Sequence, residues 1–234
     1  MSRERYEFLA AVGHELRTPL TSIRGYVETL LDEEVDAATS RRFLETVRRE
    51  ALRLGRLVDG MLDFSLLDLS AAAAPASTNV AEAVAAAMDA LAPLAGARGV
   101  RFARTGASSA YARIDEDTCV HALRNLIENA LKHGRCGGLV VVSVWDDAPW
   151  ITIAIDDDGP GVPPDEREQI FVLRVRGNGA RTQGWGIGLA LVKRIVERVA
   201  GTIAVSRSPL GGARFMLRLP ASIAPKAESA STTS

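Results

Sequence analysis

An apolar residue recurs every seven positions near the start of the sequence, and this spacing restricts the fold more than any other feature. The series is Leu9, Leu16, Ile23 and Leu30, with Val12 at an intermediate position. A heptad series of this kind is typical of a helix in a bundle or coiled coil. We therefore predict one amphipathic helix from about residue 3 to 31.

A second helix is predicted from about residue 38 to 69. Its apolar stripe consists of Leu44, Val47, Ala51, Leu54, Val58 and Met61, widened by Phe43, Leu57 and Phe64. Five arginines are expected on or beside its solvated flanks: Arg41, Arg42, Arg48, Arg49 and Arg53. The acidic run over residues 31–36 breaks the periodicity, and we interpret it as the connection between the two helices. Because a lone helical hairpin buries too little surface, we expect two copies to pair into a four-helix bundle.

His14 lies off the heptad seam, so its imidazole is expected to face solvent, and Glu15 follows it directly. A neutral imidazole has one nitrogen free to attack an electrophile, and a carboxylate can hold the other N–H. Pro19 lies inside the predicted helix, where a proline costs roughly 3 kcal/mol and should bend the helix. Considered alone, an exposed His–Glu pair is more often an ordinary solvated surface pair.

The rest of the chain alternates between helical and strand patterns after an unpatterned linker over residues 70–78. Helices are expected at about 80–94 (stopped by Pro93 and Gly96), 115–133 and 186–200. Strands are expected at 100–103, 111–114, 139–145, 150–156, 202–205 and 213–219, while 159–184 is mostly irregular. This order predicts an α+β two-layer sandwich over residues 79–220, followed by a disordered tail over 221–234.

Two polar strings in this second part suggest a ligand site. Asn125, Asn129 and Lys132 share one face of a predicted helix, and such a face suits magnesium and phosphates. The string 156–162 (Asp-Asp-Asp-Gly-Pro-Gly-Val) follows an apolar strand, where a carboxylate can accept a hydrogen bond from an exocyclic amine. Its glycines would let a flat ring approach the backbone. Alone, the strings could equally be a solvated helix face and an acidic turn or weak calcium site.

Two further strings could contact phosphate. The string 184–189 (Gly-Trp-Gly-Ile-Gly-Leu) opens a predicted helix, whose N-terminus presents N–H groups and a positive dipole end. Ile170 and Phe171 precede Arg174, Arg176 and Arg181, whose guanidinium groups could clamp a terminal phosphate. Alone, these strings could be an ordinary glycine-bearing helix start and a solvated basic loop.

The stretch from Val12 to Leu20 resembles the H-box of bacterial sensor histidine kinases. Taken in chain order, the four strings resemble the N, G1, F and G2 boxes of the ATPase superfamily shared by gyrase, heat-shock chaperones, mismatch-repair proteins and histidine kinases. Together the resemblances cover nearly the whole chain before Pro220. They imply a helical dimerisation domain over residues 1–69 and an ATP-binding domain of the Bergerat type over 79–220.

The resemblance also implies roles for single residues. His14 would be the phosphoacceptor, Glu15 its base, and Thr18 would assist dephosphorylation of a partner. Asn129 would bind Mg²⁺, Asp157 would read the adenine amine and Arg176 would meet the γ-phosphate. The full set implied for nucleotide binding is Asn125, Asn129, Lys132, His133, Asp157, Gly159, Gly161, Val162, Ile170, Arg176, Gly184, Trp185, Gly186, Ile187, Gly188 and Leu189.

We therefore expect a homodimeric, ATP- and Mg²⁺-dependent protein histidine autokinase. It would pass the phosphoryl group to an aspartate of a response regulator receiver domain, and it would also dephosphorylate that regulator. One alternative is a dimeric scaffold without kinase activity, because Arg174 stands where a second aromatic is usual and Trp185 where a small hydroxyl residue is usual. Another is an ATP-driven clamp of the gyrase kind, against which the H-box and the small size argue.

Composition narrows the location and the partners. The formal net charge is −1, which argues against a general nucleic-acid binder. We expect no membrane-spanning segment, because no apolar run reaches about 18 residues, and no secretory signal. The two cysteines show no metal-binding or CxxC spacing, which favours buried or idle thiols in a reducing compartment. We expect a cytoplasmic chain, either by itself or as the cytoplasmic part of a membrane-bound sensor.

Overall fold

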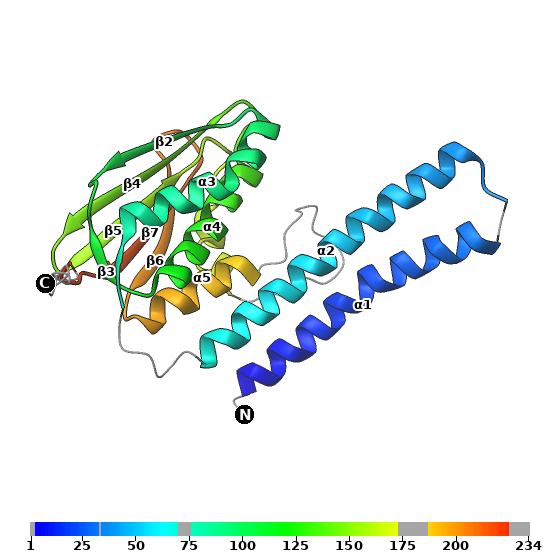
Figure 1. The fold of residues 1–234 in the computed structure, drawn as a ribbon, viewed down its shortest axis with the longest axis horizontal. Helices are drawn as coiled ribbons and strands as arrows, with labels where there is room; N and C mark the ends of the chain where they lie inside the picture. The colour runs from blue at the N-terminus through cyan, green and yellow to red at the C-terminus, as the bar shows by residue number, and fades with distance from the viewer. Residues whose placement is uncertain (1–2, 33, 70–75, 173–186, 225–234) are drawn as a thin grey trace, which may run out of the picture. The chain divides into compact units, whose positions relative to one another are not determined.

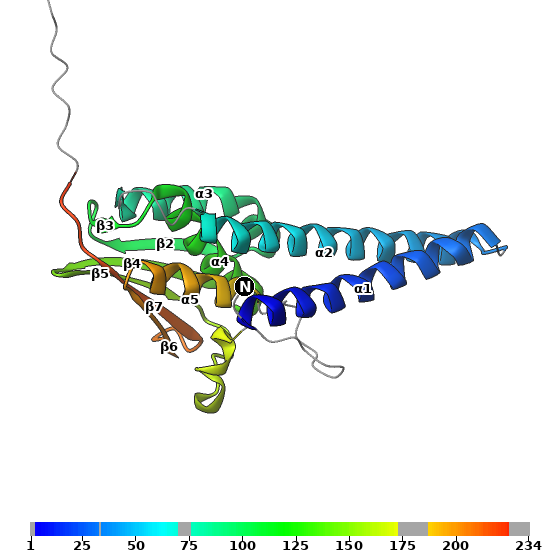
Figure 2. The same cartoon turned by 90° about the horizontal axis from the view of Figure 1, so that it is seen from below.

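The computed structural model describes residues 3–32, 34–69, 76–172 and 187–224, without the side chains of residues 3–15, 53, 56–57, 59–69 and 187. Its contacts divide the chain into two compact units. One unit contains a helical hairpin, and the other is an α/β unit built on a five-stranded sheet (Figures 1 and 2). The α+β fold class expected from the sequence is confirmed.

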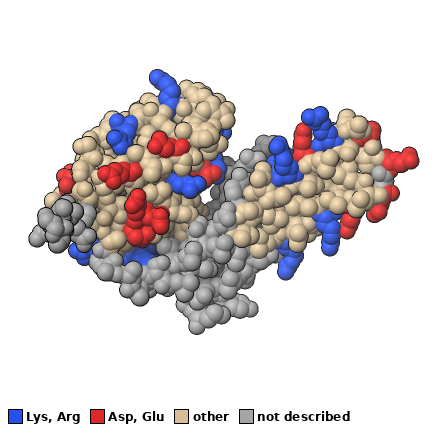
Figure 3. All heavy atoms as spheres, in the orientation of Figure 1, with Lys and Arg blue, Asp and Glu red and all other residues tan. Residues whose placement is uncertain are grey.

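The hairpin consists of α1 (Arg3–Asp32) and α2 (Ala37–Leu69), as the two apolar patterns predicted. Asp36 starts α2, because its Oδ1 accepts the N–H groups of Ala38 and Thr39 at 2.9 and 3.0 Å. Its Oδ2 accepts the Thr39 hydroxyl at 2.6 Å. These hydrogen bonds, that of the Thr39 hydroxyl above all, lower the pKa of the Asp36 carboxyl. The acidic connection thus supplies the cap of the second helix, and acids gather at this end of the hairpin in Figure 3.

The hairpin has one apolar stripe that its own helices cover and one that they leave open. Leu16, Ile23 and Leu30 of the heptad series are half-buried. Tyr26 of α1 lies against Phe43 of α2, with ring centroids 4.9 Å apart. A second set of large apolar side chains is exposed in the single chain: Leu20, Val27 and Leu31 on α1, and Leu44, Leu52 and Val58 on α2. A single hairpin therefore carries more apolar surface than it can bury.

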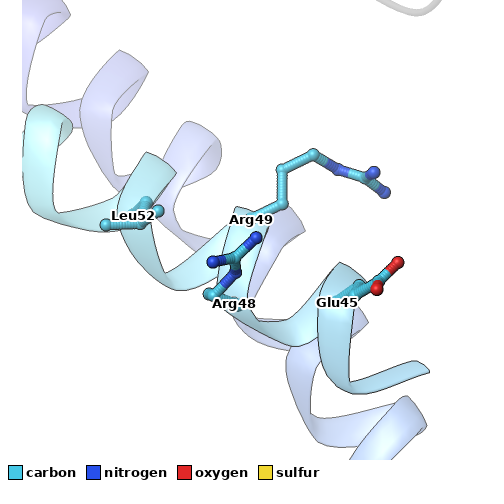
Figure 4. Close-up of a pocket in the computed structure, with 4 residues that line it drawn as sticks. All are labelled: Glu45, Arg48, Arg49 and Leu52. Carbon is cyan, nitrogen blue, oxygen red and sulfur yellow. The ribbon is translucent and has the colours of Figure 1, made fainter. Parts of the chain in front are cut away.

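Arginines occupy the outer flank of α2, as predicted. Arg41, Arg42, Arg48 and Arg49 are exposed, and Arg41 lies 3.8 Å from Glu45 one turn further along. Figure 4 shows a hollow on this flank whose lining side chains, from Glu45 to Leu52, all project from α2. Exposed ion pairs of this kind contribute little to stability, about 0.3–0.5 kcal/mol each. The flank is therefore an open, mostly charged face, which also carries the exposed Leu52, rather than an enclosed site.

The sheet of the α/β unit has the strand order β2–β4–β5–β7–β6. The strands are β2 (Arg101–Gly106), β4 (Leu139–Asp147), β5 (Trp150–Asp156), β6 (Thr202–Arg207) and β7 (Ala213–Pro220). β2 pairs with β4 in parallel, and the other neighbours are antiparallel. The two hairpins predicted from the sequence, β4–β5 and β6–β7, are confirmed.

Three helices cover one face of this sheet: α3 (Val80–Arg98), α4 (Glu116–His133) and α5 (Ile187–Arg198), as Figures 1 and 2 show. Alternate strand residues point at the helices and are fully buried, for example Val142, Ile153 and Leu217. α3 is also long and apolar enough to cross a membrane by length and composition, contrary to our expectation of no such run. A buried core helix passes the same test, and Val80, Val84 and Leu91 of α3 belong to the core.

Several elements differ from the sequence predictions. α3 runs past Pro93 and ends at Gly99, whose φ of 65° suits glycine. The missing N–H of Pro93 is tolerated because it leaves only the carbonyl of exposed Asp89 without its helical partner, where water can bind.

The β-structure around residues 77–113 also differs. β1 (Ser77–Asn79), which begins in the expected linker and ends just after it, was not predicted, and it pairs with β3 (Tyr111–Arg113). The strands β2 and β3 therefore do not form a hairpin with each other.

The start of the expected disordered tail is ordered by backbone contacts. Ala221 forms a bridge with Ala112, and the N–H of Ser222 donates to Tyr111 O at 2.7 Å. Residues 225–234 lie outside the described part of the chain. The thiols agree with the prediction in part: Cys119 is buried, which raises its pKa to about 12, while Cys136 is exposed.

Candidate functional site

The polar face of α4 carries the first group of predicted site residues. Asp115 caps the helix by accepting the N–H of Thr118 at 2.9 Å, and the opposite face packs into the core. Asn125 and Asn129, one turn apart, are half-buried. Within the described residues, the side-chain amide of Asn129 makes no hydrogen bond. The Nζ atom of Lys132 lies 2.8 Å from Glu128 Oε1. The face thus offers amide oxygens and an ammonium to a ligand.

The start of α5 lies against this face. A Cβ atom added to Gly188 would come within 2.7 Å of Asn125 Oδ1, so a larger residue would displace the amide. Asn125 Nδ2 donates to His121 O at 3.1 Å, which fixes the direction of its oxygen. The structure therefore brings the N-box and the end of the glycine-rich string together. Gly184, Trp185 and Gly186 lie outside the described residues, as does the side chain of Ile187; Leu189 is half-buried.

The three consecutive aspartates at the end of β5 have three different environments. Asp156 forms a bidentate pair with Arg214 of β7, with N–O distances of 2.9 and 2.8 Å. Asp158 accepts the N–H groups of Arg135 and Leu139. Asp157 is only 2% exposed and has no cationic side chain bonded to it in the described part of the chain. It is therefore the carboxylate of the three that is available to a ligand.

Asp157 is held by backbone groups on one oxygen only. Its Oδ1 accepts the N–H of Gly159 at 2.8 Å and that of Ala213 at 3.1 Å, while no described group donates to Oδ2. Burial raises the pKa of this carboxyl above its ordinary value, and the two backbone N–H groups and nearby His133 oppose that shift. A buried acceptor with one free oxygen suits a single neutral donor such as an exocyclic amine.

Two glycines let the chain pack closely beside this carboxylate. A Cβ on Gly159 would lie 2.4 Å from His133 O, so this turn touches the end of α4. Gly161 has a φ of 80°, and a Cβ there would lie 3.0 Å from Arg207 Nη1. Val162, next in the string, is half-buried, and its carbonyl accepts Arg167 Nε at 3.3 Å. His133 itself is exposed at the end of α4.

The segment 159–184, expected to be mostly irregular, is described as far as residue 172. It contains two short 3₁₀ turns, Pro164–Glu166 and Gln169–Phe171. Phe171 is buried and meets Phe215 of β7 edge-on at 6.3 Å, while Ile170 is half-buried. Arg174, Arg176 and Arg181 lie outside the described residues.

The histidine site lies on the other unit. His14 and Glu15 are within α1, but their side chains are outside the described part of the structure. Thr18 is exposed one turn further along, and Pro19 is a buried residue inside α1. The structure thus assigns the predicted phosphoacceptor and the polar cluster to separate units.

Sequence reasoning missed Gly212, which precedes β7. Its N–H donates to Asp157 O at 3.1 Å, and a Cβ on it would lie 2.0 Å from Asp157 Oδ1. Only glycine therefore leaves room for this carboxylate. The sequence showed a glycine in a turn, but its contact with Asp157 depends on the pairing of β7 with β5, which a local pattern does not reveal.

Two family models match the chain. The model of the His Kinase A (phospho-acceptor) domain matches residues 4–70, and that of the histidine kinase-, DNA gyrase B- and HSP90-like ATPase matches residues 114–223. The sensor-like histidine kinase SenX3 of Mycobacterium tuberculosis is 36% identical over 228 residues, which are 95% of this chain and 55% of the relative. The chain therefore spans about half the length of the curated relatives that it matches.

Solved structures agree with the fold. The ATP binding domain of PrrB from Mycobacterium tuberculosis is 30% identical with a TM-score of 0.52, covering 63% of this chain and 98% of that one. The histidine kinase ThkA in complex with the response regulator protein TrrA has a TM-score of 0.74 at 20% identity, covering 94% of this chain and 64% of that one. At that identity the second likeness concerns the fold alone.

We predict that Gly212→Ala lowers both the stability of the α/β unit and its affinity for nucleotide. The added methyl group overlaps Asp157, which should cost roughly 2 kcal/mol of unfolding free energy. Thermal unfolding and ATP titration by calorimetry measure the two effects. Gly96→Ala is the matched control, because nothing lies within 4 Å of its Cβ and helix propensity favours alanine by up to about 1 kcal/mol. Equal behaviour of the two variants would contradict the packing argument.

Proposed function

This chain belongs to the family of two-component sensor histidine kinases, and we propose that it is an ATP-dependent protein histidine autokinase that phosphorylates His14. The observation that supports this most directly is the assembly around Asp157. A buried carboxylate with one free oxygen, the amide face of α4 and the start of α5 lie in the same unit. These are the parts needed to hold a base, a metal ion and phosphates.

We propose that Asp157 Oδ2 accepts a hydrogen bond from the exocyclic amine of adenine. The amine is a neutral donor, and Oδ1 is already occupied by two backbone N–H groups. His133 would lie beside the base, and Gly159, Gly161, Val162 and Ile170 would support its pocket.

The phosphates of the nucleotide would lie between α4 and the start of α5. Lys132 and Asn125 would meet them from α4, and the N-terminus of α5 would present its N–H groups and positive dipole end. Gly184, Trp185, Gly186, Ile187, Gly188 and Leu189 would line the triphosphate, with Arg176 at the γ-phosphate.

The described residues fit a magnesium ion that is shared with the nucleotide. They contain no cluster of three His, Cys, Asp or Glu side chains that could hold a metal. Mg²⁺ in kinases is usually bound by one or two protein oxygens together with phosphate oxygens and water. The half-buried Asn129 amide, which has no partner among described residues, would supply the protein ligand. A bound ion would neutralise charge on the triphosphate.

His14 would attack the γ-phosphorus through its unprotonated ring nitrogen. An N–P bond forms as the bond to the β,γ-bridging oxygen breaks, and ADP leaves with that electron pair. Glu15 would hold the other ring N–H and stabilise the developing imidazolium, which then loses a proton to restore neutrality. Phosphoryl transfer requires mainly positioning and charge stabilisation, which the nucleotide site would supply.

We also propose a response regulator as the partner. Its receiver aspartate would take the phosphoryl group from His14. Thr18, exposed one turn along α1, would assist the later hydrolysis of that phosphoaspartate, in which water takes up the phosphoryl group and inorganic phosphate leaves. The solved ThkA structure is a complex with a response regulator protein, and its fold covers 94% of this chain. Since that relative is only 20% identical, it supports the fold of the partner-binding hairpin and no particular contact.

The open apolar stripe of the hairpin supports a homodimer. Leu20, Val27, Leu44 and Val58 are 59%, 37%, 56% and 45% exposed in the single chain. Leu20 and Val27 are a heptad apart, and Leu44 and Val58 are two heptads apart, as a bundle interface requires. Pairing with a second copy would bury this stripe.

We predict that Leu44→Asp weakens the dimer by at least about 100-fold. Two copies of the substitution would meet in a symmetric interface, and each removes a leucine worth roughly 1.5–3 kcal/mol when buried. Sedimentation equilibrium measures the dissociation constant. Arg41→Asp is the matched control, because Arg41 is also exposed on α2 but lies on the charged flank. A dimer unaffected by Leu44→Asp would place the interface elsewhere.

We predict that His14→Gln abolishes incorporation of label from γ-labelled ATP while ATP binding is retained. Glutamine has no ring nitrogen for attack, and the nucleotide site lies in the other unit. The adduct on the wild-type protein should be labile to acid and stable to base. Normal labelling of the variant would rule out His14. A wild type that shows no magnesium-dependent ATP binding would favour the scaffold hypothesis, and one that binds ATP without being labelled would favour the ATP-driven clamp.

The neighbours of His14 have separable roles under this proposal. Glu15→Ala should slow labelling roughly 100-fold, the range typical of general-base catalysis, with little effect on ATP affinity. Thr18→Ala should leave labelling intact and slow the dephosphorylation of a phosphorylated regulator. Single-turnover labelling and regulator dephosphorylation assays measure these steps. Equal effects of both substitutions on both steps would contradict the assignment.

A further inference from the structure

The loop between α4 and β4, residues 134–138, is fastened by the side chain of Asp158. Asp158 Oδ1 accepts the N–H of Arg135 at 3.0 Å, and Oδ2 accepts the N–H of Leu139 at 3.1 Å. Each carboxylate oxygen therefore binds one end of the loop. Hydrogen bonds to an ionised acceptor are roughly twice as strong as neutral ones.

The loop is shaped to receive this carboxylate. A Cβ on Gly138 would lie 2.2 Å from Asp158 Oδ2 and 2.6 Å from Oδ1. A Cβ on Gly134 would lie 3.3 Å from Oδ1. A Cβ on Gly138 would therefore overlap the carboxylate, and one on Gly134 would crowd it.

The far side of the loop is also fixed. The N–H of Gly137 donates to Arg98 O at 2.9 Å, and Arg98 Nη2 donates to Gly134 O at 3.3 Å. Arg98 comes from the end of α3, so the loop is held between α3 and the Asp158 carboxylate. The last turn of α4, with Lys132 and His133, leads directly into this loop.

Asp158 also follows Asp157 in the chain, which connects the loop to the candidate base site. The next residue, Gly159, packs against His133 O. Asp158 therefore ties the turn that carries Asp157 to the end of the helix that carries His133. A shift of this loop would change the distance between the two sides of the base site.

We propose that Asp158 is a positioning residue that sets selectivity for adenine, although it does not contact the nucleotide. By fixing the 134–138 loop, it holds Asp157 Oδ2 at the place where the adenine amine arrives. This inference rests on the proposed ATP-binding function. It adds a residue whose effect is specific to the base and does not extend to the phosphates.

The test compares ATP with inosine triphosphate, which carries an oxygen in place of the amine. Dissociation constants of both magnesium nucleotides are measured by calorimetry for the wild type, Asp158→Asn and Asp146→Asn. The asparagine at 158 places an amide NH₂ against one of the two backbone N–H groups. We expect Asp158→Asn to reduce the preference for ATP over inosine triphosphate roughly tenfold. Asp146, an exposed residue of β4, is the control and should leave the preference unchanged.

The outcomes separate this inference from the proposed function. A wild type that binds neither nucleotide overturns the proposed function itself. A wild type that prefers ATP, together with an Asp158→Asn variant of unchanged preference, overturns only the inference. If Asp158→Asn weakens the binding of both nucleotides equally, the inference is also overturned, because Asp158 would then have a purely structural role.

A measurement on the wild type covers the case in which Asp158→Asn does not fold. The amides of Arg135 and Leu139 should exchange hydrogen more slowly once ATP is bound, and inosine triphosphate should slow them less. Equal protection by the two nucleotides would overturn the inference.

Discussion

The antiparallel pairing of β5 with β7 is the contact on which the rest of the α/β unit depends. Beyond the last paired residues, the N–H of Asp157 donates to Ala213 O at 3.0 Å, and the N–H of Gly212 donates to Asp157 O at 3.1 Å. The ladder thus extends past the strand and carries the Asp157 carboxylate into the interior. Backbone N–H groups of Gly159, in the turn after β5, and of Ala213, at the start of β7, then donate to one of its oxygens. Without these donors, burial would raise the pKa of the carboxyl further and favour its neutral form.

The same register explains why three neighbouring aspartates do not act as one charge cluster. Asp156 belongs to the strand and meets Arg214 directly across the ladder. Asp158 lies beyond the strand and turns to the loop after α4. Between them, Asp157 is buried and has no cationic side chain bonded to it among the described residues. The charge of Asp158 helps burial to raise the pKa of Asp157, but each carboxylate has its own hydrogen-bond partners, so their chemical roles differ although they are adjacent in sequence.

The sequence predicted those elements whose signal is local. Long apolar repeats gave α1 and α2, and β-branched runs gave β4 to β7. The pairing of β1 with β3 and of β2 with β4 was missed, because the partners lie far apart in sequence and short strands carry little periodicity. For the site, spacing on one helix predicted Asn125 and Asn129, and strand-end chemistry predicted Asp157; these stay predictions. The contact of Gly212 with Asp157 was missed because it depends on the strand register, and the contacts of Asp158 were missed because its partners lie in and next to the loop after α4.

The placement of the proposed adenine contacts has a consequence for a protein of two units. The proposed adenine contacts all lie in the α/β unit, and their positions follow from its sheet and from the loop after α4. The proposed acceptor His14 belongs to the hairpin. Any rearrangement between the units would therefore change the approach of His14 to the γ-phosphate without altering adenine selectivity. Nucleotide selectivity and phosphoryl transfer could then be regulated independently. The first depends on packing within the α/β unit, and the second also depends on the arrangement of the two units.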